Sequence, residues 1–215
     1  MRRPGFHVGM VSDRCKRGMQ RGGALQLRPG EITCEGMSET QTGATLLPIL
    51  IYPDAVLRKP ARLVTPADAE EVRSLVPSML ATMYKAPGIG LAANQIGSLL
   101  RVVVVDVAPK EEPAPIALIN PEIIAKSDEL ATQEEGCISI PELYVEVTRP
   151  ARVKIRYQDV QGVKKEIEAD GLLAACLQHE IDHLNGVLFV DYLSALKRNM
   201  MLRKLAKAQK EQKAR

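Results

Sequence analysis

This 215-residue chain contains a pair of histidines four residues apart in an apolar stretch. His179 and His183 belong to the segment QHEIDH at residues 178–183, with GLLAACL before it and LNGVLFV after it. Positions i and i+4 of a helix share one face, so both imidazoles can bind the same metal ion. Glu180 is turned away by about 100°, which suits a general base acting on water. The segment predicts a metal-binding helix; two surface histidines are the alternative.

A catalytic metal site needs a third protein ligand and an open position for water. Only 32 residues follow His183, and they contain two acids and no histidine, so we expect the third ligand upstream. Cys137 is the best candidate, because Gly136 before it permits an unusual turn of the backbone. Cys176 is the competitor, but it lies on the same expected helix as His179 and is interpreted as core or pocket wall. A buried core thiol is the alternative role for Cys137.

Turn residues and apolar periodicity divide the folded region into helices and strands. Helices are expected from Thr65-Pro66 to about Tyr84, from Gly171 to about Asn185, and from Ser194 to about Gln212. Strands are expected at Arg101–Val107, Pro115–Asn120, Val145–Thr148, Val153–Gln158 and Lys164–Ile167. Neighbouring strands are close enough for antiparallel pairing, and there is no repeat and no βαβ rhythm. The expected fold class is α+β.

Charge is unevenly distributed along a chain whose net charge is +3. Residues 44–196 carry 14 basic and 21 acidic side chains, whereas residues 197–215 carry eight basic side chains and one acidic. Residues 1–43 lack apolar periodicity, and we expect a disordered extension or a mis-set start there, with Met37 as the plausible true start. An organellar transit peptide is the alternative, because the first 30 residues are Arg-rich with Asp13 as their one acid.

The composition gives no sign of a membrane or secreted protein. No apolar run approaches the roughly 20 residues that cross a bilayer, and no secretion signal is recognisable. The chain has four cysteines and no CxxC pair, so a disulfide framework is not expected. We therefore expect a cytoplasmic protein.

Three segments together resemble the peptide deformylase family. GIGLAANQ at residues 88–95, EGCIS at 135–139 and QHEIDH at 178–183 match the family motifs G-x-G-L-A-A-x-Q, E-G-C-x-S and Q-H-E-x-D-H in order and spacing. The likeness covers roughly residues 46–205 and leaves residues 1–43 without a counterpart. It implies a catalytic domain at 44–196, with antiparallel β-sheets packed around a central metal-binding helix, followed by a C-terminal helix at 197–215. The implied reaction is hydrolysis of the N-formyl group from the formyl-methionine of newly made proteins, releasing formate.

The resemblance also implies a role for each matched position. Glu180 would be the acid/base group. Gln95 and the backbone N–H of Ile138 would donate to the formyl oxygen, and Gly90 would offer its backbone to the substrate. The implied metal ligands are Cys137, His179 and His183. The implied lining of the methionine pocket is Ile89, Leu172, Ala175 and Cys176. Glu135 would pair with Arg149 to hold the cysteine loop.

The metal and the partners follow from two different arguments. Cys and His ligands by themselves favour zinc, whereas the resemblance implies one Fe²⁺ per chain, with Ni²⁺ or Co²⁺ as good substitutes and Zn²⁺ a poorer one. The implied partners are N-formyl-methionyl nascent peptides and the ribosome surface, whose phosphates would attract the basic C-terminal helix. Its basic residues include Lys197, Arg198, Arg203, Lys204, Lys207 and Lys210. No membrane and no sequence-specific nucleic acid is expected as a partner.

Two other functions fit part of the sequence. A zinc metallopeptidase shares the histidine pair but usually takes its third ligand downstream. A non-enzymatic, ribosome-associated module would hold a structural metal with four protein ligands, with Cys176 as the candidate fourth. Two positions depart from the family pattern: Tyr144 stands where many relatives carry arginine, and Pro77 predicts a kink or a late start in the first helix.

Overall fold

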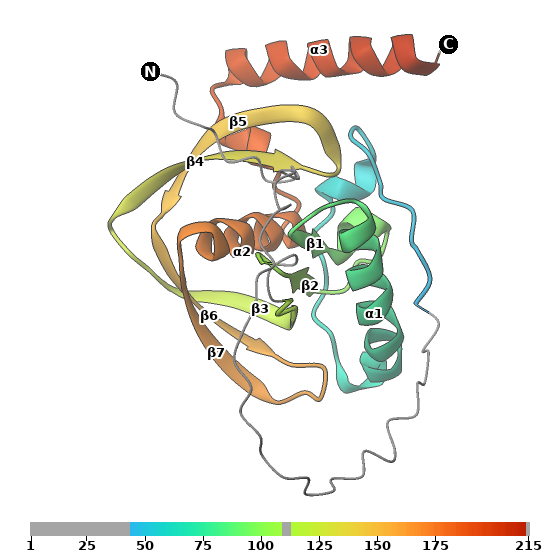
Figure 1. The fold of residues 1–215 in the computed structure, drawn as a ribbon, viewed down its shortest axis with the longest axis vertical. Helices are drawn as coiled ribbons and strands as arrows, with labels where there is room; N and C mark the ends of the chain where they lie inside the picture. The colour runs from blue at the N-terminus through green and yellow to red at the C-terminus, as the bar shows by residue number, and fades with distance from the viewer. Residues whose placement is uncertain (1–43, 109–112, 214–215) are drawn as a thin grey trace, which may run out of the picture.

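The computed structural model describes residues 44–108 and 113–213, the last six of these by their backbone alone. The described part is an α+β fold with two antiparallel sheets and a buried helix between them, as expected (Figure 1). The predictions for residues 1–43 lie outside the described residues. Among the helices described, none is long and apolar enough to cross a membrane.

The larger sheet has five antiparallel strands in the order β1-β2-β3-β6-β7. Their bounds are β1 Gly90–Ala92, β2 Val102–Val105, β3 Ile116–Lys126, β6 Arg152–Gln158 and β7 Lys164–Asp170. The second sheet is a ribbon of β4, Leu130–Cys137, and β5, Ile140–Pro150.

In the part of the chain that the structure describes, three α-helices accompany these sheets, and short 3₁₀ turns lie between the elements. The helices are α1 Ala69–Lys85, α2 Gly171–Leu184 and α3 Ala195–Lys213. The 3₁₀ turns are η1 Ala55–Arg58, η2 Pro66–Asp68, η3 Ala93–Ile96 and η4 Phe189–Tyr192. In Figure 1, α2 crosses the middle of the molecule, α1 lies beside β1 and β2, and α3 lies beyond the ribbon.

The run of four valines in β2 is explained by helices on both faces of the sheet. Side chains alternate between the two faces of a strand. Val103 and Val105 belong to the cluster that contains Leu177 of α2, whereas Val102 and Val104 belong to the cluster that contains the methionines of α1. Because both faces are covered, the strand is apolar throughout and all four residues are buried.

One expected strand boundary is wrong. The sequence predicts that the strand beginning near Pro115 ends at Asn120, but β3 continues through Pro121 to Lys126. The register shifts between Ile119 and Glu122, and Asn120 has a φ of 52°. A proline is tolerated in a strand at such a bulge, because the bulge already interrupts the ladder of hydrogen bonds. The Asn120 side chain supports the bulge by bonding both the N–H and the C=O of Val64, at 2.8 and 2.9 Å.

Two strands and one helix start also differ from expectation. The sequence predicts no strand at Gly90–Ala92 or at Leu130–Cys137, where β1 and β4 form. Both lack the β-branched composition that marks strands, and pairing with β2 and β5 forms them instead. A late start of the first helix after Pro77 is wrong, since α1 begins at Ala69 directly after the turn η2.

The C-terminal end of α2 is closely fixed, and this placement positions the site. The helix ends at Leu184, and Gly186 follows with a φ of 75°, a conformation typical of the residue after a helix. A side chain at Gly186 would overlap the backbone carbonyl of Arg58. The Asn94 side-chain amide donates to the carbonyl oxygen of His183. The last turn of α2 is therefore held against η1 and η3.

Candidate metal centre

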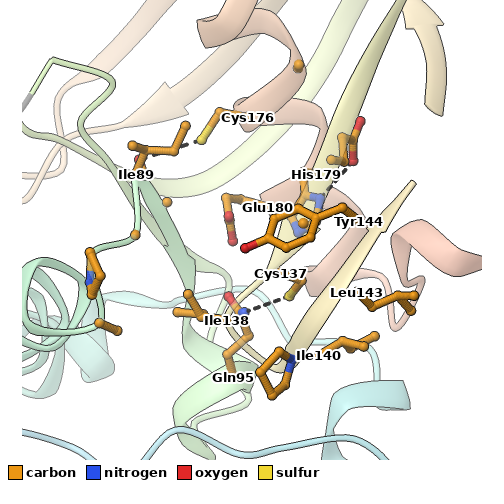
Figure 2. Close-up of a pocket in the computed structure, with 18 of the residues that line it drawn as sticks. Ile89, Gln95, Cys137, Ile138, Ile140, Leu143, Tyr144, Cys176, His179 and Glu180 are labelled. Carbon is orange, nitrogen blue, oxygen red and sulfur yellow. Dashed lines mark hydrogen bonds and ion pairs between the residues drawn. The ribbon is translucent and has the colours of Figure 1, made fainter. Parts of the chain in front are cut away.

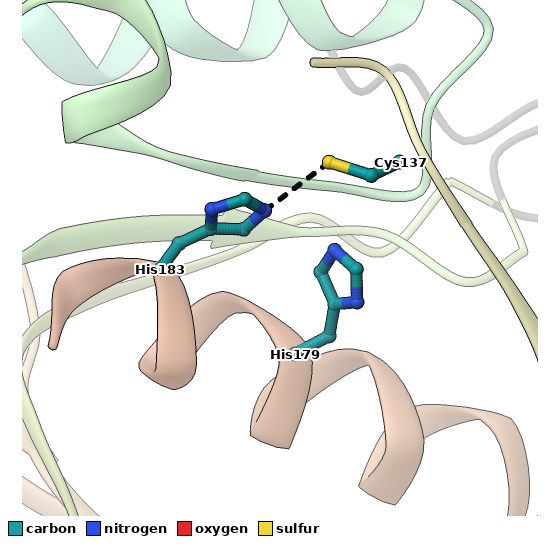
Figure 3. A group of neighbouring side chains, drawn as sticks. All are labelled: Cys137, His179 and His183. Carbon is teal, nitrogen blue, oxygen red and sulfur yellow. Dashed lines mark hydrogen bonds between the residues drawn. The ribbon is translucent and has the colours of Figure 1, made fainter. Parts of the chain in front are cut away.

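One turn of α2 and the end of β4 bring three candidate ligands together (Figure 3). His179 and His183 are 8% and 1% exposed, and their ring centroids are 4.9 Å apart. Cys137 is the last residue of β4, where the register with β5 shifts and the chain turns towards α2. The ligand atoms of Cys137, His179 and His183 all lie within 4.8 Å of one another.

The chemistry and spacing of this group suit one divalent metal ion. Bonds of about 2.0–2.3 Å in a tetrahedral site hold the ligand atoms roughly 3.3–3.8 Å apart. The Cys137 Sγ lies 3.2 Å from Nε2 of His183. A small adjustment of the side chains would place all three ligand atoms at bonding distance from one metal ion. Burial lowers the pKa of His183 well below its usual value, whereas hydrogen bonds to Cys137 and Glu135 raise the pKa of His179 well above it despite its burial, so metal binding would release a proton from His179. Three protein ligands leave a fourth position for water or substrate.

His179 is oriented by a carboxylate on its second ring nitrogen. Its Nδ1 lies 2.9 Å from Oε2 of Glu135, which points Nε2 towards Cys137 and His183. Glu135 is held in turn by Arg149, whose Nε and Nη2 donate to the two carboxylate oxygens at 2.6 and 3.1 Å. The predicted pair of Glu135 and Arg149 is therefore present, and both residues are buried.

Cys176 lies close to the site without joining the ligand group. Burial raises the pKa of its thiol well above the usual value, so the thiol stays protonated. Its Sγ donates to the carbonyl oxygen of Ile89 at 3.6 Å. The ligand group found among the described residues contains Cys137 and the two histidines but not Cys176. A closed structural site with four protein ligands is therefore not formed there.

A cavity of about 300 Å³ opens beside the three ligands (Figure 2). The residues with predicted catalytic roles that line it are Gly90, Gln95, Ile138 and Glu180. The predicted methionine-pocket residues Ile89, Leu172, Ala175 and Cys176 line it as well. Tyr144 lies at the cavity with 40% of its surface exposed, on the neighbouring strand opposite Gly136. The structure thus brings every predicted site residue to one place.

Glu180 has the environment of a group that exchanges protons near neutral pH. It is 5% exposed, and its Oε2 has no hydrogen-bond partner among the described residues. Burial raises the pKa of Glu180 to about 7. A Cβ on Gly90 would lie 2.5 Å from Oε1 of Glu180 and 2.8 Å from Sγ of Cys176. Only glycine lets β1 pass so close to the carboxylate.

Gln95 is held rigidly at the edge of the cavity. It is 1% exposed, and its Oε1 accepts the N–H of Ala92 at 2.8 Å. Its Nε2 donates to Oγ of Ser139 at 3.1 Å and lies 3.5 Å from Sγ of Cys137. The amide nitrogen therefore faces the ligand group, with one of its N–H bonds directed at the sulfur.

The structure adds supporting residues that the sequence analysis did not single out. Asp182 and Tyr192 bond to Arg149, Ser139 bonds to Gln95, and the ring of Phe189 stacks on His179 at 5.8 Å between centroids. Asp182 and Ser139 lie inside the matched motifs, so the sequence alone could have indicated that they support the site. Nothing local marks Phe189 or Tyr192, because their contacts with His179 and Arg149 form only when η4 folds against α2 and β5.

Comparisons with known proteins agree with this geometry. The sequence model of the family described as polypeptide deformylase matches residues 46–199. A peptide deformylase from Agrobacterium fabrum is 55% identical over 165 residues, which cover 76% of this chain and 96% of that protein. One from Methylocella silvestris is 57% identical over 169 residues, covering 77% and 86%.

Solved structures lead to the same family. The crystal structure of a peptide deformylase from Legionella pneumophila superposes with a TM-score of 0.73 at 45% identity, covering 80% of this chain and 99% of that one. A peptide deformylase from Synechococcus elongatus, solved in complex with actinonin, gives a TM-score of 0.69 at 46% identity, covering 74% and 86%. This chain belongs to the peptide deformylase family.

Proposed function

We propose that this chain removes the formyl group from the N-terminal methionine of new proteins, with Cys137, His179 and His183 as the ligands of one divalent metal. The observation that carries the proposal is the convergence of these three ligand atoms within 4.8 Å beside Glu180, a buried residue whose Oε2 has no hydrogen-bond partner among the described residues. Family membership supplies the reaction, which is hydrolysis of the formamide bond with release of formate.

When bound here, a divalent metal supplies a Lewis acid that activates water and polarises the formyl oxygen. We propose Fe²⁺ as the working metal, with Ni²⁺ or Co²⁺ as substitutes, although the mixed Cys and His ligands also suit Zn²⁺. The chain's own contribution is to hold three donors in place and to leave the cavity side of the group open.

Glu180 is proposed to move the proton. Its carboxylate takes a proton from the attacking water and later delivers it to the leaving amino group of methionine. A pKa of about 7 suits both steps near neutral pH. Gln95 and the backbone N–H of Ile138 are proposed to donate to the oxygen that gains negative charge as the formyl carbon becomes tetrahedral.

The cavity is proposed to hold the peptide in a fixed direction. Among the described strands, β1 is an edge strand that pairs with β2 alone, so its other edge could pair with an extended substrate at Gly90. The mostly apolar side chains of Ile89, Leu172, Ala175 and Cys176 would receive the methionine side chain. In this proposal the formyl end would lie at the metal ligands and the rest of the peptide would leave the cavity.

The test is an assay of anaerobically purified protein with metal analysis of the same sample. Formyl-Met-Ala-Ser should release formate, whereas a peptide without the formyl group should not be cleaved at any bond. Removal of the metal by a chelator should abolish the activity, and Fe²⁺ or Co²⁺ should restore it. Cleavage of internal peptide bonds would instead support a metallopeptidase, and metal binding without any hydrolysis would support a non-enzymatic module.

We also propose that α3 docks on the ribosome surface and that the protein works in the cytoplasm of a bacterium. Among the described residues of α3, Lys197, Arg203 and Lys204 are exposed, and basic side chains are attracted to RNA phosphate. Changing these three residues to glutamine should weaken ribosome binding and reduce its dependence on salt, without affecting hydrolysis of formyl-Met-Ala-Ser. Unchanged ribosome affinity and salt dependence would count against docking through α3.

A further inference from the structure

We infer that Tyr192 is a positioning residue for the metal centre, acting on the ligand His179 through Arg149 and Glu135. Tyr192 is outside the cavity, at the end of η4, and 49% of its surface is exposed. The inference rests on the proposed metal binding by His179, and it assigns a role to a residue that touches neither the metal ligands nor the cavity.

A continuous series of hydrogen bonds links the Tyr192 hydroxyl to the ligand. The hydroxyl donates to Oδ2 of Asp182 at 2.8 Å and accepts from Nη1 of Arg149 at 3.1 Å. Arg149 also donates from Nη1 to Asp182 at 2.7 Å, and it holds both oxygens of Glu135. Glu135 then meets Nδ1 of His179 at 2.9 Å. Each contact in the series is therefore a direct hydrogen bond.

The burial of Arg149 makes its orientation depend on all its partners. Its side chain is 5% exposed, so water cannot replace a lost partner easily. Three partners from different elements hold the guanidinium: Glu135 on β4, Asp182 on α2 and Tyr192 on η4. The guanidinium also lies 4.5 Å from the centroid of the Tyr192 ring. Loss of the hydroxyl leaves one N–H bond of Arg149 and one oxygen of Asp182 less well paired, and the guanidinium can then shift relative to Glu135.

The element that carries Tyr192 contacts the same ligand a second time. Phe189 begins η4 and stacks on the ring of His179, with 30° between the two planes. η4 therefore contacts His179 in two ways. The ring of Phe189 stacks on the imidazole, and Tyr192 is linked to Nδ1 of His179 through Arg149 and Glu135. His183 has no comparable carboxylate, since its Nδ1 has no partner among the described residues. We therefore infer that η4 fixes the position of the His179 ring.

If Tyr192 had a structural role alone, Tyr192→Phe would lower the stability of the protein without changing its metal affinity. The chain offers a matched control that separates these two outcomes. Tyr84 is 39% exposed, and its hydroxyl donates to Oδ2 of Asp106 at 2.7 Å. Both tyrosine rings are half-exposed, and both hydroxyls donate to a carboxylate. Tyr84→Phe and Tyr192→Phe therefore remove equivalent hydrogen bonds. Only the bond of Tyr192 leads to a metal ligand.

The experiment measures the affinity of the full chain for Co²⁺ by competition with a chelator, together with the thiolate–Co²⁺ absorption band and the melting temperature. Groups bonded directly to a metal ligand typically change affinity by about 10–100-fold when removed. Tyr192 is further from the ligand, so Tyr192→Phe should weaken Co²⁺ binding by about three- to tenfold and alter the absorption band. Tyr84→Phe should leave both unchanged while lowering the melting temperature by a similar amount.

A double variant sharpens the test. Asp182→Asn should also weaken Co²⁺ binding, and the combination with Tyr192→Phe should weaken it by less than the product of the single effects, because both act through Arg149. Equal Co²⁺ affinity in the wild type, Tyr84→Phe and Tyr192→Phe would overturn the inference. A wild-type protein that fails to bind Co²⁺ would contradict the metal site itself, and the inference with it.

Discussion

At the scale of single residues, the cavity depends on two groups that are held in place before any substrate arrives. Gln95 uses its carbonyl oxygen on the N–H of Ala92, which leaves its amide nitrogen facing Cys137. Glu180 is fixed on the buried helix α2, and its Oε2 has no hydrogen-bond partner in the part of the chain that the structure describes. A carboxylate oxygen that the described residues leave unbonded can exchange a proton with a bound water, as is proposed for Glu180.

Gln95→Ala tests the proposed donor to the formyl oxygen. Loss of one such donor typically costs about 10²–10³ in turnover. The variant should lose that much of its kcat and keep its metal, because Gln95 is not a ligand in the group of Cys137 and the two histidines. The control is Gln133→Ala, a residue that lines the same cavity without an assigned role. Full metal content with an unchanged rate in Gln95→Ala would exclude the role.

Gly90→Ala tests the close approach of β1 to the acid/base group. The added Cβ would lie 2.5 Å from Oε1 of Glu180, so the carboxylate has to move. We expect kcat to fall at least about tenfold, since misplacement by an ångström can cost 10²-fold. Gly88→Ala is the matched control, because its nearest neighbour would be at 3.5 Å, an ordinary contact. Similar rates for the two variants would show that Glu180 tolerates the displacement.

At the scale of elements, the end of α2 determines where the histidine pair lies. The turn after the helix requires a left-handed residue at Gly186, and it also requires that this residue have no side chain, because the backbone of Arg58 is in contact. Asn94 holds the carbonyl of His183 in the same turn. The two ligands on α2 thus take their position from η1 and η3 as well as from the helix.

Gly186→Ala separates these two requirements when compared with Gly162→Ala. Both glycines have positive φ, 75° and 81°, but a Cβ at Gly162 meets no atom within 4 Å. The left-handed conformation costs alanine roughly 1–2 kcal/mol. The overlap at Gly186 should add about 1–3 kcal/mol more, as overpacking does. Urea unfolding measures the difference, and equal losses of stability would show that the contact with Arg58 relaxes at no cost.

At the scale of the whole molecule, Arg149 joins the ribbon to the rest of the fold. It lies on β5 and bonds to β4, to α2 and to η4. Removing one partner of a buried ion pair leaves a buried charge uncompensated, which typically costs about 3–5 kcal/mol. The same residue orients Glu135, so its loss affects both global stability and the metal centre.

Arg149→Leu should therefore lower the free energy of unfolding by about 3–5 kcal/mol. Arg152→Leu is the control, since Arg152 pairs with Glu129 at 3.0 Å with both side chains 63% exposed. Such exposed pairs contribute about 0–1 kcal/mol. Urea unfolding of the two variants checks the prediction, and a loss of similar size in both would mean that the buried network contributes no more than a surface pair.

Local spacing in the sequence is enough to predict several parts of the fold and the site. The i, i+4 histidines predict the ligand face of α2, and the β-branched run predicts β2. Because few residues that could bind a metal follow His183, Cys137 is the best candidate for the third ligand. The apolar and turn patterns also predict the α+β class. The boundary at Asn120 and the strands β1 and β4 were missed, because a bulge and long-range pairing override local composition.

The support of the metal ligands depends on contacts that form when the chain folds. The histidine pair predicts that a metal site exists, and the motifs predict its three ligands and the pair of Glu135 with Arg149. The extension of that pair to Asp182 and Tyr192, and the stacking of Phe189 on His179, come from elements that meet only in the folded chain. The physical reason is that ligand spacing is a property of one helix, whereas ligand orientation depends on buried hydrogen bonds between elements.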